Sequence, residues 1–206
     1  MNAVDVNTAV DVILIGTLAA VWLAAGLLAD GMPTSGNARQ MRRRAGLLSA
    51  LVGAGVAVFA AVPLVSGLVP GVSAAPTAAL LPAVPALLVL TATVRRLGLV
   101  RRGAGAFSTA PRTPVPPALR AAAAHPLLAA PLQVTGLAAL VGLPIAAGLV
   151  ALPGGQATAT AGITAIAIVL AVAVIGIRAA LRHSRLAPLA MAPLRRDRDR
   201  TPVGAR

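Results

Sequence analysis

The sequence predicts an all-α membrane protein, a bundle of about five transmembrane helices, and three observations support that fold class. Of its 206 residues, 58% are hydrophobic and only 11% are charged, and the mean hydropathy is +0.87. Soluble domains carry about 25% charged residues because their surfaces face water. The apolar residues stand in long blocks without the alternation typical of a membrane β-barrel, and the arginines fall between alternate blocks.

The apolar blocks set the predicted helices. A helix needs roughly 20 apolar residues to cross the hydrocarbon layer, and five segments approach or reach this length, at residues 10–28, 45–69, 77–94, 127–152 and 160–177. The third is the shortest, and Pro82 and Pro85 are expected to kink it. The first is predicted as a retained helix rather than a cleaved signal peptide, because no basic side chain precedes it.

The arginines predict the topology. All 18 basic residues are arginines, and they lie between helices one and two, between helices three and four, and after helix five. The loops at residues 70–76 and 153–159 contain no charge. Cytoplasmic loops of membrane proteins are rich in arginine and lysine. The pattern therefore predicts an N-terminus outside and a C-terminus inside, in a cell (plasma) membrane of bacterial type.

Two further features concern the organisation of the chain. Residues 1–186 are predicted to form the transmembrane domain, and residues 187–206 a basic, disordered cytoplasmic tail. Residues 55–69 resemble residues 136–150, with Pro63 matching Pro144, which suggests that helices two-three and four-five are duplicated hairpins. Chance similarity between alanine- and glycine-rich segments is the other interpretation. Residues 118–125 are predicted to form a short helix at the inner membrane surface.

Ionisable residues deep in a membrane are candidate functional groups because their burial is costly. The sequence offers Asp11 and Asp30, at the two edges of helix one, and both are expected to reach headgroups and water. Interfacial solvation therefore explains them better than a proton or cation site. Gln133, with Thr135 beside it, is the best buried polar candidate, and one hydrogen bond to a neighbouring helix would account for it.

The remaining candidates do not form a recognisable site. His125 and His183 lie near arginines without nearby carboxylates, and the sequence has no cysteine, so metal ligands are lacking. Asp197 and Asp199 alternate with arginines in the tail and are expected to form local ion pairs. We therefore predict no catalytic residue, cofactor or metal. Without aromatic residues interleaved among the arginines, we predict no nucleic-acid partner either.

Rows of small residues predict close helix packing, because they let helix backbones approach in lipid. Three such rows are spaced by four residues: Ser49, Gly53, Ala57 and Ala61; Gly16, Ala20 and Ala24; and Ala138, Gly142 and Ala146. The sequence does not say whether the packing partners lie within the chain or in another subunit.

For function, the sequence leaves three hypotheses. The first is a non-catalytic membrane protein, such as an accessory subunit, with membrane lipid and a protein partner or a second copy as its contacts. The second is a small transporter or channel for a neutral or hydrophobic solute, with Pro63 and Pro144 near its path. The third is a lipid-acting enzyme that uses Asp30 or His125. The arginines add a further expectation, which is attraction to anionic lipid headgroups at the cytoplasmic face.

Overall fold

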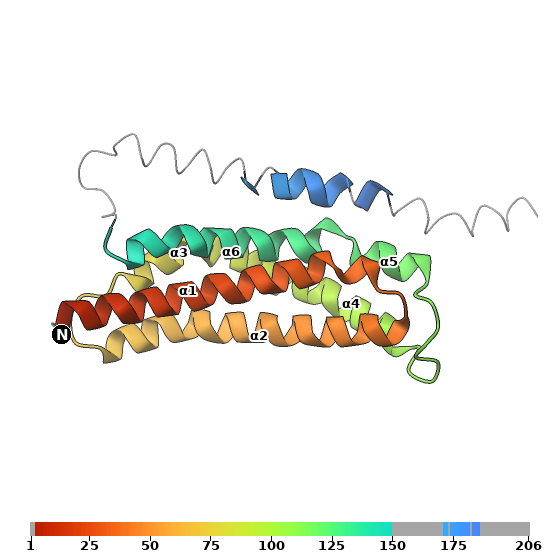
Figure 1. Cartoon of the computed structure of the whole chain (residues 1–206), viewed down its shortest axis with the longest axis horizontal. Helices are drawn as coiled ribbons and strands as arrows, with labels where there is room; N and C mark the ends of the chain where they lie inside the picture. Colours follow the sequence, from red (N-terminus) through yellow and green to blue (C-terminus); the bar gives the residue numbers. More distant parts are fainter. Residues whose placement is uncertain (1–2, 150–170, 173, 182, 186–206) are drawn as a thin grey trace, which may run out of the picture.

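The computed structural model describes residues 3–149, 171–172, 174–181 and 183–185, and helices dominate these ranges (Figure 1). The α-helices are α1 (Ala3–Asp30), α2 (Ala38–Leu68), α3 (Ala75–Leu88), α4 (Val94–Gly105), α5 (Pro117–Ala123) and α6 (Pro126–Ala146). A 3-10 turn, η1 (Met32–Thr34), follows α1, and a π-helix, η2 (Val89–Thr93), joins α3 to α4. The described residues contain no strand, so the all-α prediction is confirmed.

Four stretches of this structure are long and apolar enough to cross a membrane: Val6–Thr34, Ala38–Leu68, Ala75–Gly105 and Pro117–Ala146. They correspond to the first four predicted helices. The fifth, predicted at residues 160–177, lies mostly outside the described residues, although residues 171–172 and 174–177 are helical. The chain is therefore a multi-pass helical membrane protein.

The predicted helix boundaries were wrong at the basic ends. The prediction started helix two at residue 45 and ended helix three at residue 94, which left the adjacent arginines in loops. In the structure α2 begins at Ala38, and the third span continues through η2 and α4 to Gly105. Arginine is a good helix former, so a change from apolar to basic residues marks the membrane surface rather than the end of the helix. The fourth predicted helix is also shorter, because α6 ends at Ala146.

The helices pack around α1, which contacts both α2 and α6 (Figure 1). Trp22 of α1 is fully buried at the centre of the core. It approaches α2 closely because a Cβ at Gly55 would stand 2.8 Å from the indole ring. On its other side α1 meets α6, where a Cβ at Gly136 would lie 2.8 Å from the backbone nitrogen of Leu23. Glycines thus set the spacing of the three helices.

The proline residues are accommodated by contacts between helices. Pro131 has no N–H, so it leaves the carbonyl of Leu127, four residues earlier, without its usual helical donor. The hydroxyl of Thr93, a buried residue of η2, donates to that carbonyl at 2.8 Å. Membrane helices tolerate proline where a neighbour satisfies the freed backbone group in this way. The bond also ties the third span to α6.

Candidate functional site

The two ends of the bundle differ sharply in charge. The described arginines gather at the end where α2 and α6 begin: Arg39, Arg42, Arg43, Arg44, Arg95, Arg96, Arg101, Arg102, Arg112, Arg120, Arg178 and Arg185. Over the 24 residues from Arg44 to Leu68, α2 rises about 36 Å towards the other end. The polarity that the sequence predicted along the chain is therefore a polarity of the folded bundle.

Two surface hollows at the basic end are lined by arginines. One, of about 610 Å³, is bordered by Arg39, Arg42 and Arg43. The other, of about 470 Å³, lies beside η2 and is bordered by Arg95, Arg96 and Leu99. A guanidinium group pairs well with phosphate, and Leu99 adds an apolar side chain. These hollows are chemically suited to anionic headgroups.

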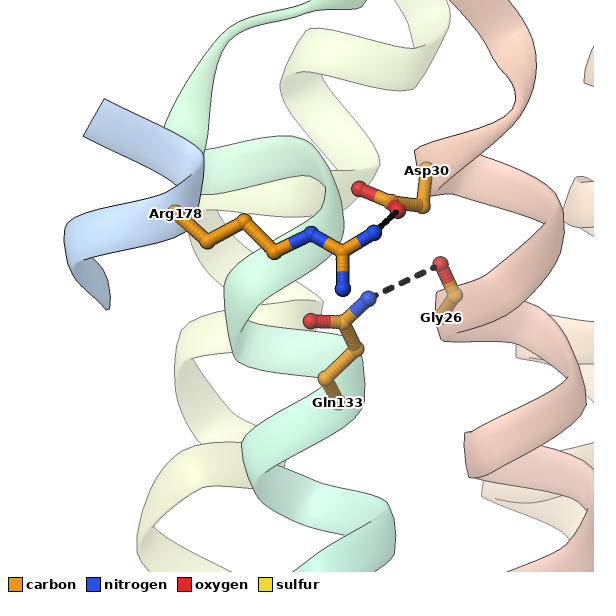
Figure 2. A network of polar contacts seen from close by, with 4 residues as sticks. All are labelled: Gly26, Asp30, Gln133 and Arg178. Atoms are coloured by element: carbon orange, nitrogen blue, oxygen red, sulfur yellow. Dashed lines mark hydrogen bonds and ion pairs between the residues drawn. The ribbon is translucent and has the colours of Figure 1, made fainter. Parts of the chain in front are cut away.

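A small polar network lies between α1, α6 and the helical residues after 170 (Figure 2). Asp30 and Arg178 form an ion pair at 3.6 Å, with 73% of the Arg178 side chain exposed. Gln133 donates to the carbonyl of Gly26 at 3.5 Å, which is the helix-to-helix hydrogen bond predicted for it. Thr135 is buried and bonds to its own helix, at the carbonyl of Pro131. The bond from Gln133 and the ion pair of Asp30 thus join separate helices.

The two histidines lie together, which the sequence analysis did not predict. The ring centroids of His125 and His183 are 5.0 Å apart. His125 caps α6, because its Nδ1 accepts from the backbone N–H of Leu127 at 3.2 Å. The described residues contain no group of three histidines, cysteines or acids that would hold a metal ion. Asp197 and Asp199, the predicted tail ion pairs, lie outside the described residues.

At the opposite end, Asp11 is buried, and the prediction that it reaches water was wrong. Only 3% of the residue is exposed. Its carboxylate accepts from the Ser73 hydroxyl at 2.7 Å and from the backbone N–H groups of Ala74 and Ala75 at 2.7 and 3.3 Å. These groups lie at the start of α3, whose N-cap residue Ala74 has no side-chain cap. Asp11 therefore supplies an acceptor from α1, beside the Ser73 hydroxyl, which also accepts from the Ala75 N–H at 3.3 Å. A helix N-terminus favours a negative charge.

Asn7 lies one turn before Asp11, and sequence reasoning missed it. The residue is 7% exposed and donates to the Pro70 carbonyl at 2.8 Å. Its Oδ1 atom is buried and has no hydrogen-bond partner among the described residues. The spacing of four residues from Asp11 on one helix was the available signal. Beside both residues is a cavity of about 370 Å³, also lined by Pro70, Val72 and Ala146.

Only one of the three predicted small-residue rows is mostly buried within the described bundle. Of the row Ser49, Gly53, Ala57 and Ala61, the middle two residues are exposed, as are Ala20 and Ala24 of the second row. Of the third row, Gly142 and Ala146 are buried against α3 and α1, as expected. The chain instead uses Gly26, Gly55 and Gly136 for its internal contacts. Spacing alone does not identify the face that a helix buries.

Six exposed small residues of α2 form one continuous row together with Leu64. Its seven members alternate in steps of four and three residues along the helix: Gly46, Ala50, Gly53, Ala57, Ala60, Leu64 and Gly67. A Cβ added at Gly46, Gly53 or Gly67 would meet no atom within 4 Å. This surface, which we call the α2 row, is therefore open among the described residues.

Together these features define a polytopic helical bundle with one basic end, one end holding a buried carboxylate, and an uncovered row of small residues between them. Comparison with protein-family models, curated proteins and solved structures gives no match to this chain.

Proposed function

We propose that this chain is a non-catalytic membrane protein that works as an accessory subunit, and that it pairs with a partner helix through the α2 row. The observation that carries the proposal is the contrast between two kinds of glycine. Trp22, Gln133 and Leu23 pack against Gly55, Gly26 and Gly136 within the chain, whereas no described residue covers Gly46, Gly53 or Gly67.

The α2 row has the geometry that a second membrane helix requires. Alternating steps of three and four residues keep one seam facing a partner along a left-handed crossing. In lipid, small residues favour association because they let two backbones approach and gain van der Waals contact. Apart from Leu64 at 69% exposure, no large side chain stands on the row. The partner helix that fits this row is an apolar membrane helix whose side chains pack against the small residues of the row.

Site-specific photocrosslinking tests the proposal. A photoreactive leucine analogue at Leu64 should trap a different membrane protein in native membranes, and the same analogue at Leu80 of α3, which is 70% exposed, should not. Gly53→Leu should abolish the adduct without unfolding the chain. Ala24→Leu, on an exposed position of α1 level with Gly53, is the matched control. An adduct with a second copy alone, or equal trapping at Leu80, contradicts the accessory role.

We also propose that the basic end faces the cytoplasm of a cell membrane of bacterial type, with the Asp11 end outside. The support is the separation of the arginines from Asp11 along the bundle together with the positive-inside rule. Because the chain has no cysteine, single cysteines label without background. A membrane-impermeant maleimide should label Val72→Cys in intact cells and Ser108→Cys only after permeabilisation. The reverse labelling pattern would refute the orientation.

No specific observation favours the two alternative functions. Pro63 and Pro144, expected to lie near a transport path, are both exposed on the surface of the bundle. Asp30 pairs with Arg178, and His125 caps α6, so each residue named for a lipid-acting enzyme has a structural contact. The arginine-lined hollows support a simpler role for lipid, which is anchoring of the basic end to anionic headgroups.

A further inference from the structure

The cavity beside Asp11 is a second feature of the molecule, independent of the α2 row and of the proposed accessory role. It lies at the end of the bundle where α2 and α6 finish and α3 begins. Nine described residues border it, from α1, the α2–α3 loop, the end of α6 and the turn after it. Two of them, Asn7 and Asp11, are polar and more than nine-tenths buried. With about 370 Å³ it is within the range of small-molecule sites.

The electrostatic character of the cavity favours a cation. Asp11 is the acidic residue in its described lining, and the described arginines lie at the other end of the bundle. The last turns of α2 and α6 also end here, and helix C-termini carry partial negative charge. Only the start of α3 opposes them, and the Asp11 carboxylate already caps it. Buried charges are normally paired, so a positive group is the missing component.

The hydrogen-bond acceptors in the cavity indicate which class of cation fits it. The Asn7 Oδ1 is an acceptor that lacks a donor, and an ionised carboxylate accepts about four bonds, of which described groups supply three. Calcium takes six to eight oxygen ligands, and among the described residues Asp11 is the only carboxylate that lines the cavity. Quaternary ammonium groups are held by aromatic rings, and the described part of the lining contains none. A primary ammonium group, with three donors, fits these acceptors.

We infer that this cavity binds a primary ammonium group on a short carbon chain. The ammonium group donates to Asp11 and Asn7, and the carbon chain lies against Pro70, Val72 and Ala146. Two sources carry this chemistry: a soluble amine, and the headgroup of phosphatidylethanolamine in the surrounding leaflet.

The test uses the full chain in detergent, with ethylammonium chloride as the probe and the fluorescence of Trp22, the single tryptophan, as the unfolding signal. Ethylammonium should raise the melting temperature with saturation, whereas sodium chloride and tetramethylammonium chloride at equal ionic strength should not. An equal shift with all three salts, or no shift with ethylammonium, would overturn the inference.

Two substitutions test whether ethylammonium acts at this cavity, one at the buried Asp11 and one at the exposed Val72. Val72 is 97% exposed, so Val72→Arg should fold and place a tethered cation at the cavity. The ethylammonium concentration for half the maximal shift should rise more than about tenfold in Val72→Arg and in Asp11→Asn. Asp30→Asn, which removes the acidic side chain at the other end of α1, should leave it unchanged. An unchanged response in Val72→Arg places the probe elsewhere and refutes the site.

Nanodiscs distinguish the two sources. In discs of phosphatidylglycerol the ethylammonium shift should persist. If it disappears when phosphatidylethanolamine is included, the lipid headgroup occupies the cavity. If it persists in both membranes, a soluble amine is the ligand. A shift that is absent from phosphatidylglycerol discs would show that the detergent result does not describe the membrane protein, and would overturn the inference.

Discussion

The close approach of α1 and α6 makes a quantitative prediction about Gly136. A Cβ at this position would stand 2.8 Å from both the Cγ and the backbone nitrogen of Leu23. Ordinary van der Waals contact begins near 3.5 Å. Gly136→Ala therefore forces the two helices apart by about 0.7 Å, because a backbone atom cannot rotate away as a side chain can.

The expected magnitude follows from a comparison with Gly53. Overpacking a well-packed interface costs about 1–3 kcal/mol. Both substitutions gain the same helix propensity, up to about 1 kcal/mol in going from glycine to alanine. Gly53→Ala meets no atom within 4 Å, so it retains the gain without a clash. The free energy of unfolding of Gly136→Ala should therefore be lower than that of Gly53→Ala by about 1–3 kcal/mol.

Unfolding in mixed micelles of mild detergent and dodecyl sulfate, followed by Trp22 fluorescence, measures this difference. Trp22 is the only tryptophan and is fully buried, so its emission reports loss of the core. If Gly136→Ala is as stable as Gly53→Ala, then α1 and α6 do not approach through this glycine, and the packing described for the bundle is refuted.

Two further pairs of variants test the polar contacts in the same assay. Asp11→Ala leaves the backbone N–H of Ala74 without its acceptor and should lower the free energy of unfolding by about 1–3 kcal/mol. Asp30→Ala breaks an ion pair whose Arg178 side chain is 73% exposed and should cost at most about 1 kcal/mol. Equal losses would contradict the capping role of Asp11. Thr93→Val leaves the Leu127 carbonyl unpaired and should cost about 1 kcal/mol, whereas Thr91→Val, which loses a bond within its own exposed helix, should be near neutral; a larger loss for Thr91 would contradict the bridging role of Thr93.

The spanning helices were predictable because lipid constrains a chain through length and hydrophobicity, which are properties of the sequence itself. The helix ends were less predictable because the change from apolar to basic residues reports the membrane boundary. The backbone does not stop there. α2 takes its first hydrogen-bond acceptors from a distant loop, since the N–H groups of Ala38 and Arg39 donate to Thr113 and Pro111 at 3.0 and 2.9 Å. The contacts from these two loop residues, over 70 residues away, have no local signal. The helix also has a local cap, because the Asn37 side chain accepts from the Gln40 N–H at 2.9 Å, and this pair was a signal of the helix start that the sequence offered.

The burial of Asp11 was also not predictable from the local sequence. A charged residue near a helix end is usually solvated, and by sequence position Asp11 has that appearance. Its burial depends on the start of α3, more than 60 residues later in the chain, lying over it. The open α2 row and the filled glycines also look alike in sequence. Only the direction that each glycine faces separates the internal contacts from the available surface.

The structure bears on the similarity between residues 55–69 and residues 136–150. Gly55 and Gly136 occupy matching positions in the two similar segments, and α2 and α6 both run from the basic end towards the Asp11 end. Each glycine receives a neighbouring residue of α1, Trp22 for Gly55 and Leu23 for Gly136. Chance similarity predicts no common packing partner for the two glycines. Duplication around an added first helix predicts one, because two copies of one hairpin would bury the same glycine against whatever lies between them. The shared contact with α1 therefore favours duplication.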